Sequence, residues 1–239
     1  MQIGVLGTGL VGETIATALV AAGHRVRMGS RSADNPQAAG WSAAHGPDAS
    51  HGTFADAVRG ADIVFNCTAG AASLEALRMA GADTLADRIL VDVANPLDFS
   101  QGMPPTLTVC NTDSLGEQIQ REFPRLRVVK TLNTVNALVM VDPARVPGKH
   151  HLFLCGNDPG AKARVAALLE SAFRWPAQAL LDLGDITAAR ATEMLVPIWV
   201  RLFVQFGTGD FSFHLAGAPE QPAPGAGAPP LEVAPPAVH

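Results

Sequence analysis

Three glycines at a fixed spacing near the start of the chain could hold a phosphate group. They lie in the run Gly7-Thr8-Gly9-Leu10-Val11-Gly12, a Gly-x-Gly-x-x-Gly pattern that follows an apolar strand and opens a helix. The first glycine allows a tight turn, the second lets the backbone approach a pyrophosphate, and the third lets the helix pack closely on the strand. Free amides and the helix dipole favour an anion there. The run predicts a bound dinucleotide; the alternative is a tight turn without a ligand.

The second predicted strand ends in hydroxyl groups and a guanidinium. Ser30, Arg31 and Ser32 follow this strand, at the distance from the glycines where NAD-binding proteins place an acidic residue that holds the ribose hydroxyls. This chain has no acid at that point. Arg31 can instead bind a 2′-phosphate through two parallel charge-assisted hydrogen bonds. These residues favour NADP(H) over NAD(H), unless Arg31 is only a solvated residue at the start of a loop.

Polar and small residues lie at the ends of three later predicted strands. In open α/β sheets, ligands bind outside the carboxyl ends of the strands. We therefore expect the rest of the cofactor to be bordered by Asn66, Cys67, Thr68, Ala69, Ala94, Asn95 and Asn133. Asn95 and Asn133 either orient the nicotinamide carboxamide or the acceptor ring, or are purely structural amides satisfied by nearby backbone.

Cysteine usage indicates neither a metal site nor a nucleophile. Cys67, Cys110 and Cys155 are odd in number, far apart, and without a Cys-x-x-Cys pair or a histidine at metal-binding spacing. We therefore expect a reducing compartment and no metal. Cys67 has no base assigned to it, so we interpret it as a small packed residue.

Composition restricts the partners. Hydrophobic residues make up 48% of the chain and charged residues 16%, which is typical of a packed globule. A net charge of −5 argues against a general nucleic-acid or anionic-membrane surface. The start lacks the basic segment of a secretory signal, and the apolar run 195–204 contains Pro197 and Arg201 and is too short to span a bilayer. We expect a cytoplasmic, soluble protein whose partner is a small-molecule electron acceptor.

Strands and helices alternate along most of the chain, which predicts the α/β class: a Rossmann-type, doubly wound, mostly parallel sheet with a small C-terminal helical domain. We expect an NADP-binding domain over residues 1–148 and a smaller α/β extension over 149–216. Residues 217–239 are rich in Pro, Ala and Gly and predict a disordered tail. Residues 35–51 are interpreted as a helix followed by a loop.

One long helix is predicted outside this alternation, over residues 187–206. Its apolar residues form a wide stripe, and Pro197 should bend it, because the proline ring collides with the carbonyl of Glu193. A stripe that wide needs a partner surface. A symmetric homodimer would supply one, and so would the chain's own nucleotide domain.

Four runs carry a resemblance to a known family: the glycine run, Gly29-Ser30-Arg31, Lys130-Thr131-Leu132-Asn133-Thr134-Val135 and Leu154-Cys155-Gly156-Asn157-Asp158. Over about residues 1–216 the chain resembles the NADPH-dependent coenzyme F420 reductases (F420H2:NADP oxidoreductases). The same runs are similar to the NADPH-binding domain of the STEAP-type metalloreductases.

The resemblance implies an oxidoreductase that transfers hydride between NADP(H) and coenzyme F420 or a flavin such as FMN or FAD. It implies that Ser30 and Arg31 hold the 2′-phosphate. Some archaeal members carry a histidine near the deazaflavin where this chain has Asn133, and a lysine after the arginine that is absent here. The identity of the acceptor therefore stays open. Hydride transfer of this kind needs no acid, base or metal from the protein, because the chemistry belongs to the cofactors.

Two other functions compete with this hypothesis. One is reduction of a small imine or carbonyl, as in the pyrroline carboxylate reductases, although the C-terminal part is short for their dimerisation bundle. The other is a redox-sensing module that binds NADPH without turnover. Oxidation of NADPH by F420, FMN or FAD would exclude that module.

Overall fold

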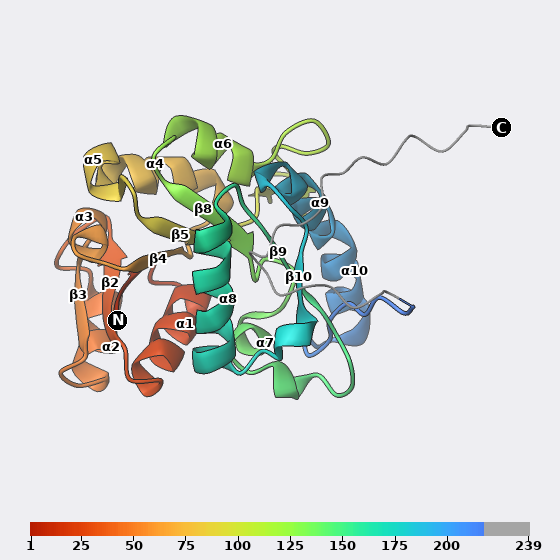
Figure 1. Cartoon of the computed structure of the whole chain (residues 1–239), viewed down its shortest axis with the longest axis horizontal. Coiled ribbons are helices and arrows are strands. Elements are labelled where there is room, and N and C mark those ends of the chain that lie inside the picture. Colours follow the sequence, from red (N-terminus) through yellow and green to blue (C-terminus); the bar gives the residue numbers. More distant parts are fainter. Residues whose placement is uncertain (218–239) are drawn as a thin grey trace.

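The computed structural model describes residues 1–217, so the predicted tail lies outside the described residues from position 218 onward. Its central feature is an eight-stranded sheet with the order β10-β9-β8-β5-β4-β1-β2-β3 (Figure 1). The strands are β1 (Gln2–Leu6), β2 (Arg25–Ser30), β3 (Ala49–Thr53), β4 (Ile63–Asn66), β5 (Ile89–Asp92), β8 (Arg127–Thr131), β9 (Leu152–Cys155) and β10 (Leu180–Asp182).

The sheet is parallel except at one pair of strands. From β3 to β8 all neighbouring strands run in the same direction, in the order of a dinucleotide-binding sheet. β9 pairs with β8 in the antiparallel direction, and β10 runs parallel to β9. Residues 149–216 therefore contribute two strands to the same sheet. The predicted Rossmann-type, mostly parallel α/β fold is confirmed.

Helices cover both faces of the sheet and enclose two hydrophobic cores (Figure 1). Strands such as β4 and β5 are buried along their whole length because both faces are covered. One core includes residues of α1 (Leu10–Ala21), α2 (Pro36–Ala44), α7 (Ala137–Val141) and α8 (Pro159–Phe173). The other includes residues of α3 (Phe54–Val58), α4 (Gly70–Ala80), α5 (Ala82–Leu85), α6 (Leu115–Glu122) and α9 (Ala189–Met194).

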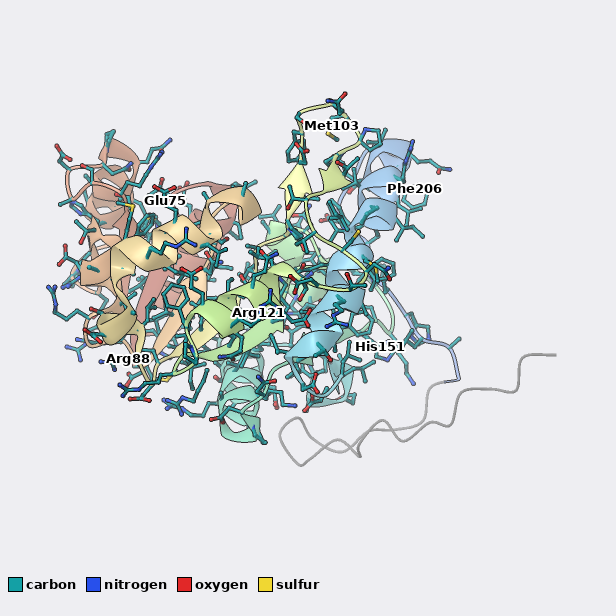
Figure 2. The ribbon with its side chains drawn as sticks, turned by 90° about the horizontal axis from the view of Figure 1, so that it is seen from above. Glu75, Arg88, Met103, Arg121, His151 and Phe206 are labelled. Carbon is teal, nitrogen blue, oxygen red and sulfur yellow. The ribbon has the colours of Figure 1, made fainter. Side chains whose placement is uncertain are left out.

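Smaller elements complete the described chain. β6 (Leu97–Asp98) and β7 (Thr106–Leu107) form an antiparallel pair apart from the main sheet. Figure 2 shows Met103, in the loop between them, projecting from the body of the molecule, and its side chain is 61% exposed. Short 3-10 helices lie at Pro143–Arg145, Ala177–Ala179 and Ile186–Ala188, and α10 (Val196–Phe206) follows α9.

Two predicted elements differ from the structure. Residues 49–51, expected as part of a loop, belong to the edge strand β3, which pairs in register with β2. The single long C-terminal helix is divided at Leu195 into α9 and α10. Pro197 occupies the second position of α10, where a missing amide hydrogen costs no internal bond, so the proline begins a new helix.

Candidate functional site

The carboxyl ends of the central strands gather the predicted site residues at one edge of the sheet. Parallel register places Leu6 opposite Gly29 on one side and Asn66 on the other, and Asn66 lies opposite Asp92. The loops that leave these strands carry the glycine run, Arg31, Thr68, Ala69, Ala94 and Asn95. Asn133 joins this edge two residues after the end of β8.

The three glycines of the turn have different surroundings. Gly7 has a φ of +114°, and a Cβ there would lie 2.7 Å from the carbonyl oxygen of Cys67. A Cβ on Gly12 would lie 2.2 Å from the carbonyl oxygen of Gly7, so this glycine permits close packing of α1 on the turn. A Cβ on Gly9 would meet no atom of the described residues within 4 Å, and its φ of −79° suits any residue. Space beside Gly9 is therefore open for a ligand.

The start of α1 is available to an anion. Gly9 is its N-cap residue, and no side chain of the described residues caps the helix. Leu10 and Val11 begin the helix, and Leu10 is 71% exposed. Thr8, beside the turn, donates a hydrogen bond from its hydroxyl to Oε1 of Gln37 at 3.2 Å. The first amides of a helix lack internal partners, so this end can bind a phosphate.

The predicted 2′-phosphate residues close β2. Ser30 is 6% exposed, and its hydroxyl donates to the carbonyl oxygen of Ser32 at 2.5 Å. The exposed guanidinium of Arg31 has neither a hydrogen bond nor an ion pair within residues 1–217. The hydroxyl of Ser32 donates to the carboxylate of Asp34, so it would have to turn away to reach a phosphate. Arg31 is thus the free cation of this group.

Asn95 and Asn133 form a reciprocal pair. Nδ2 of Asn95 donates to the carbonyl oxygen of Asn133, and Nδ2 of Asn133 donates to Oδ1 of Asn95, both at 2.9 Å. Asn133 is 5% exposed, and its Oδ1 is buried without a hydrogen-bond partner among the described residues. Leu132, just before it, holds a φ of +65°, a backbone conformation that costs a residue with a side chain about 1–3 kcal/mol. The free Oδ1 of Asn133 can accept a hydrogen bond from an amide.

A buried charged cluster, which the sequence interpretation missed, lies beneath this edge. Nζ of Lys130 is 2.8 Å from Oδ2 of Asp92 and 2.8 Å from Oε1 of Glu193, and it donates to the carbonyl oxygen of Ala94 at 2.5 Å. None of the three side chains is more than 1% exposed. Burial alone would lower the pKa of Lys130, but the carboxylates of Asp92 and Glu193 raise it above its ordinary value. We call Asp92, Lys130 and Glu193 the buried triad.

Polar side chains connect the triad to the end of β4. Nδ2 of Asn66 donates to Oδ1 of Asp92 at 2.8 Å and to the hydroxyl of Ser73 at 3.0 Å. Oδ1 of Asn66 accepts the hydroxyl of Thr68 at 2.6 Å. Asn66 was expected to border the cofactor, but it is fully buried and belongs to this network. The sequence signal for this network was a charged residue next to the apolar residues of each of two strands, Asp92 in β5 and Lys130 in β8, because a buried charge must be paired.

Burial and the charge of Asp92 raise the pKa of the Cys67 thiol, so it stays protonated. Within residues 1–217, His, Cys, Asp and Glu side chains form no group of three that could hold a metal. None of the described helices combines the length and the apolar character that a bilayer span requires.

Two cavities lie elsewhere and contain none of the predicted site residues. One, of about 300 Å³, is lined by Arg25, Arg27 and Arg59 among others. The other, of about 610 Å³, is lined by residues including His150, His151 and His214. An extended dinucleotide binds along the edge of a sheet rather than in a closed chamber, so the strand ends define the candidate site.

Comparison with known proteins identifies a matching family model and a similar solved structure. A family model described as coenzyme F420-dependent NADP oxidoreductase matches residues 2–96. The crystal structure of a candidate F420-dependent NADP reductase from Arthrobacter sp. FB24 is 53% identical, with a TM-score of 0.84, and the match covers 90% of this chain and 99% of that one.

More distant proteins share part of the pattern. Metalloreductase STEAP3 from Rattus norvegicus is 30% identical over 205 residues, which are 83% of this chain but only 38% of STEAP3. The chain thus spans well under half the length of that curated relative. An imine reductase from Myxococcus stipitatus, with 18% identity and a TM-score of 0.58, shares the fold alone. The extent and identity of the Arthrobacter match, together with the family model, show that this chain is an NADP-dependent oxidoreductase of the coenzyme F420-dependent NADP oxidoreductase family.

Proposed function

We propose that this protein transfers hydride between NADP(H) and a deazaflavin, coenzyme F420, with a flavin such as FMN or FAD as the alternative acceptor. The observation that carries the proposal is the 53% identity, over nearly its whole length, to a chain described as a candidate F420-dependent NADP reductase. The metalloreductase activity named for STEAP3 belongs to a much longer protein and is not carried over.

The cofactor in this proposal lies along the carboxyl edge of the sheet. The amides of residues 7–12 and the start of α1 hold the pyrophosphate, and the open space beside Gly9 admits it. Arg31 holds the 2′-phosphate with the help of Ser30 and Ser32. Thr68, Ala69 and Ala94 border the cofactor as it continues past the ends of β4 and β5.

Asn133 and Asn95 orient the nicotinamide end in this proposal. The buried Oδ1 of Asn133 accepts a hydrogen bond from the carboxamide, which satisfies an otherwise unpaired atom. Asn95 fixes the side chain of Asn133 through their reciprocal hydrogen bonds. When bound, the nicotinamide supplies or receives the hydride. The protein contributes alignment and exclusion of water rather than an acid or a base.

An anaerobic acceptor screen tests the proposal. NADPH consumption is followed with F420, FMN, FAD and a cyclic imine, each at the same concentration. We expect turnover with F420 or with a flavin. Tight NADPH binding without turnover on any acceptor would instead indicate a redox-sensing module, and turnover with the imine alone would indicate an imine reductase.

We also propose that α10 mediates a homodimer. The exposed apolar side chains on this helix include Ile198, Val204 and Phe206, which are 51%, 64% and 56% exposed. Figure 2 shows Phe206 at the periphery of the molecule. Burial of such a surface against a second copy removes apolar area from water and so favours association.

A further inference from the structure

We propose that Glu193 is a positioning residue for hydride transfer: through Lys130 it fixes the backbone at Ala94 and hence the Asn95–Asn133 pair. Glu193 lies on α9, outside the predicted nucleotide-binding region, and touches neither of the two asparagines. This inference rests on the proposed function, because it assigns the Asn95–Asn133 pair to the nicotinamide end of the cofactor.

Lys130 is the junction of the proposed connection. An ammonium group has three N–H donors, and those of Lys130 are matched by Asp92, Glu193 and the carbonyl oxygen of Ala94. Its side chain is fully buried, so water cannot replace a lost partner. The position of the Ala94 carbonyl is therefore tied to the positions of both carboxylates.

Glu193 is itself held firmly from the other side. Its Oε2 accepts the amide hydrogen of Leu115 at 2.9 Å, and its Oε1 accepts that of Gly116 at 3.1 Å. These are the first two residues of α6, where the helix dipole favours a carboxylate. A Cβ on Gly116 would lie 3.0 Å from Cβ of Ala189, so α6 and α9 pack closely. The carboxylate thus joins α6 and α9 to the sheet.

The connection from Glu193 through Lys130 reaches the predicted nicotinamide end of the site at Ala94 and Asn95. Ala94 precedes Asn95, whose side chain makes both hydrogen bonds of the Asn95–Asn133 pair: its Nδ2 donates one and its Oδ1 accepts the other. Asn95 is also confined from behind, because a Cβ on Gly70 would lie 2.0 Å from its carbonyl oxygen. A small movement of the Ala94 carbonyl would therefore turn Asn95 and displace Oδ1 of Asn133.

Stability alone gives a weak reason for the triad. Buried ion pairs often contribute little net stability compared with apolar residues of similar size, because desolvation offsets the attraction. A fixed geometry is a use that such a group can serve, and hydride transfer is sensitive to misplacement of the reacting carbons. The triad lies beneath the carboxyl ends of the strands, where the proposed function places the nicotinamide and where accurate positioning of the reacting carbons would matter.

Single-turnover kinetics of Glu193→Gln test the inference. The variant is saturated with NADPH, mixed with F420 or the flavin that the wild type reduces, and compared for NADPH dissociation constant and hydride-transfer rate constant. We expect the rate constant to fall about tenfold or more while the dissociation constant stays within about twofold. Glu193→Asp, which keeps the charge but withdraws the carboxylate, should show a smaller fall.

Glu117→Gln is the matched control. Glu117 also joins α6 to α9, through hydrogen bonds from the guanidinium of Arg190 at 2.8 and 2.5 Å, but it does not contact Lys130. A merely structural role for Glu193 predicts a loss of thermal stability but no change in the rate constant of the folded variant. We expect this control to keep the wild-type rate constant.

The fluorescence anisotropy of bound NADPH gives a readout that needs no acceptor. We expect Glu193→Gln to lower it, because the ring is held less firmly, and Glu117→Gln to leave it unchanged. A wild-type rate and anisotropy in folded Glu193→Gln, or in folded Glu193→Asp where Glu193→Gln does not fold, would overturn the inference, as would failure of both variants to fold. Absence of turnover in the wild type would overturn the proposed function instead, and the anisotropy comparison would still decide the role of Glu193.

Discussion

At the residue scale, Gly9 and Gly12 belong to one turn but make different demands on their surroundings. Gly9 has open space where a side chain would lie, whereas Gly12 faces the carbonyl oxygen of Gly7. We expect Gly9→Ala to fold normally and to lose about tenfold or more in NADPH affinity, because the methyl group enters the pyrophosphate space. Gly12→Ala should lower the free energy of unfolding by about 1–3 kcal/mol. Calorimetric binding and denaturant unfolding measure the two effects; normal NADPH affinity in Gly9→Ala would place the diphosphate elsewhere.

Arg31 tests the choice between the two nicotinamide dinucleotides. Its guanidinium has no partner in the described chain and is available for a 2′-phosphate. We expect Arg31→Asp to weaken NADPH binding by about 2 kcal/mol or more, through loss of a charge-assisted pair, and to leave NADH binding little changed. Arg164→Asp, the same charge change at an exposed position of α8, is the control. Equal losses for both nucleotides would show that Arg31 does not contact the 2′-phosphate.

The cysteines offer a test of pKa and burial. Burial raises the pKa of Cys155 to about 12 and also raises that of Cys67, whereas Cys110 is exposed. Because both raised pKa values lie above pH 8, Cys67 and Cys155 remain thiols there and react poorly. We expect thiol titration at pH 8 to modify Cys110 rapidly in the folded protein and all three cysteines after unfolding. Rapid modification of Cys67 would revive it as a candidate nucleophile.

Sequence reasoning located the edge residues but not what lies beneath them. The glycine spacing and the missing acid near Arg31 are local signals, readable without the fold. The buried triad is not local: Glu193 reaches Lys130 and the start of α6 only because α9 folds back against α6. Asp92 and Lys130 could have been flagged as charges in apolar strands, but their partner could not have been identified from spacing.

At the scale of the elements, α10 leaves much of its apolar surface exposed. Val196 and Val200 are its only buried residues, and Ile198 on the opposite side is 51% exposed. We expect the protein to sediment as a dimer and Ile198→Glu to sediment as a monomer, because a charge in an apolar interface is costly to desolvate. Ala163→Glu adds the same charge to the exposed side of α8 and should leave the dimer intact. A monomeric wild type would contradict the proposed role of α10.

Elements with strong local patterns were predicted, and those that depend on neighbours were not. The apolar runs of β4 and β5 identify buried parallel strands by themselves. The residues of β3 include no large apolar side chain, so this strand exists through its pairing with β2 and could not be recognised alone. The division between α9 and α10 at Leu195 lies two residues before Pro197; the proline marked the irregular part of the helix, but the sequence did not indicate the residue at which the helix divides.

At the scale of the whole molecule, the parallel strands from β3 to β8 and the added strands β9 and β10 form one continuous sheet. β8 connects the two parts, since it pairs with β5 on one side and with β9 on the other. Residues of the C-terminal part therefore contact the strands of the other part directly, as Glu193 does with Lys130 at 2.8 Å. The direction of β9 is a long-range property that no spacing in the sequence indicated.

Isotope transfer tests the central claim most directly. NADPH carrying two deuterium atoms at C4 is mixed anaerobically with the protein and F420, and the reduced deazaflavin is analysed by mass spectrometry. With FMN and FAD, reduction of the ring is followed by absorbance and its rate is compared with that for undeuterated NADPH, because a deuteride delivered to the flavin N5 exchanges with water. The account predicts that one deuterium per molecule appears on the ring carbon of the deazaflavin or, failing that, that a flavin is reduced at a rate slowed by the deuterium. Bound NADPH that neither labels the deazaflavin nor reduces a flavin would contradict it.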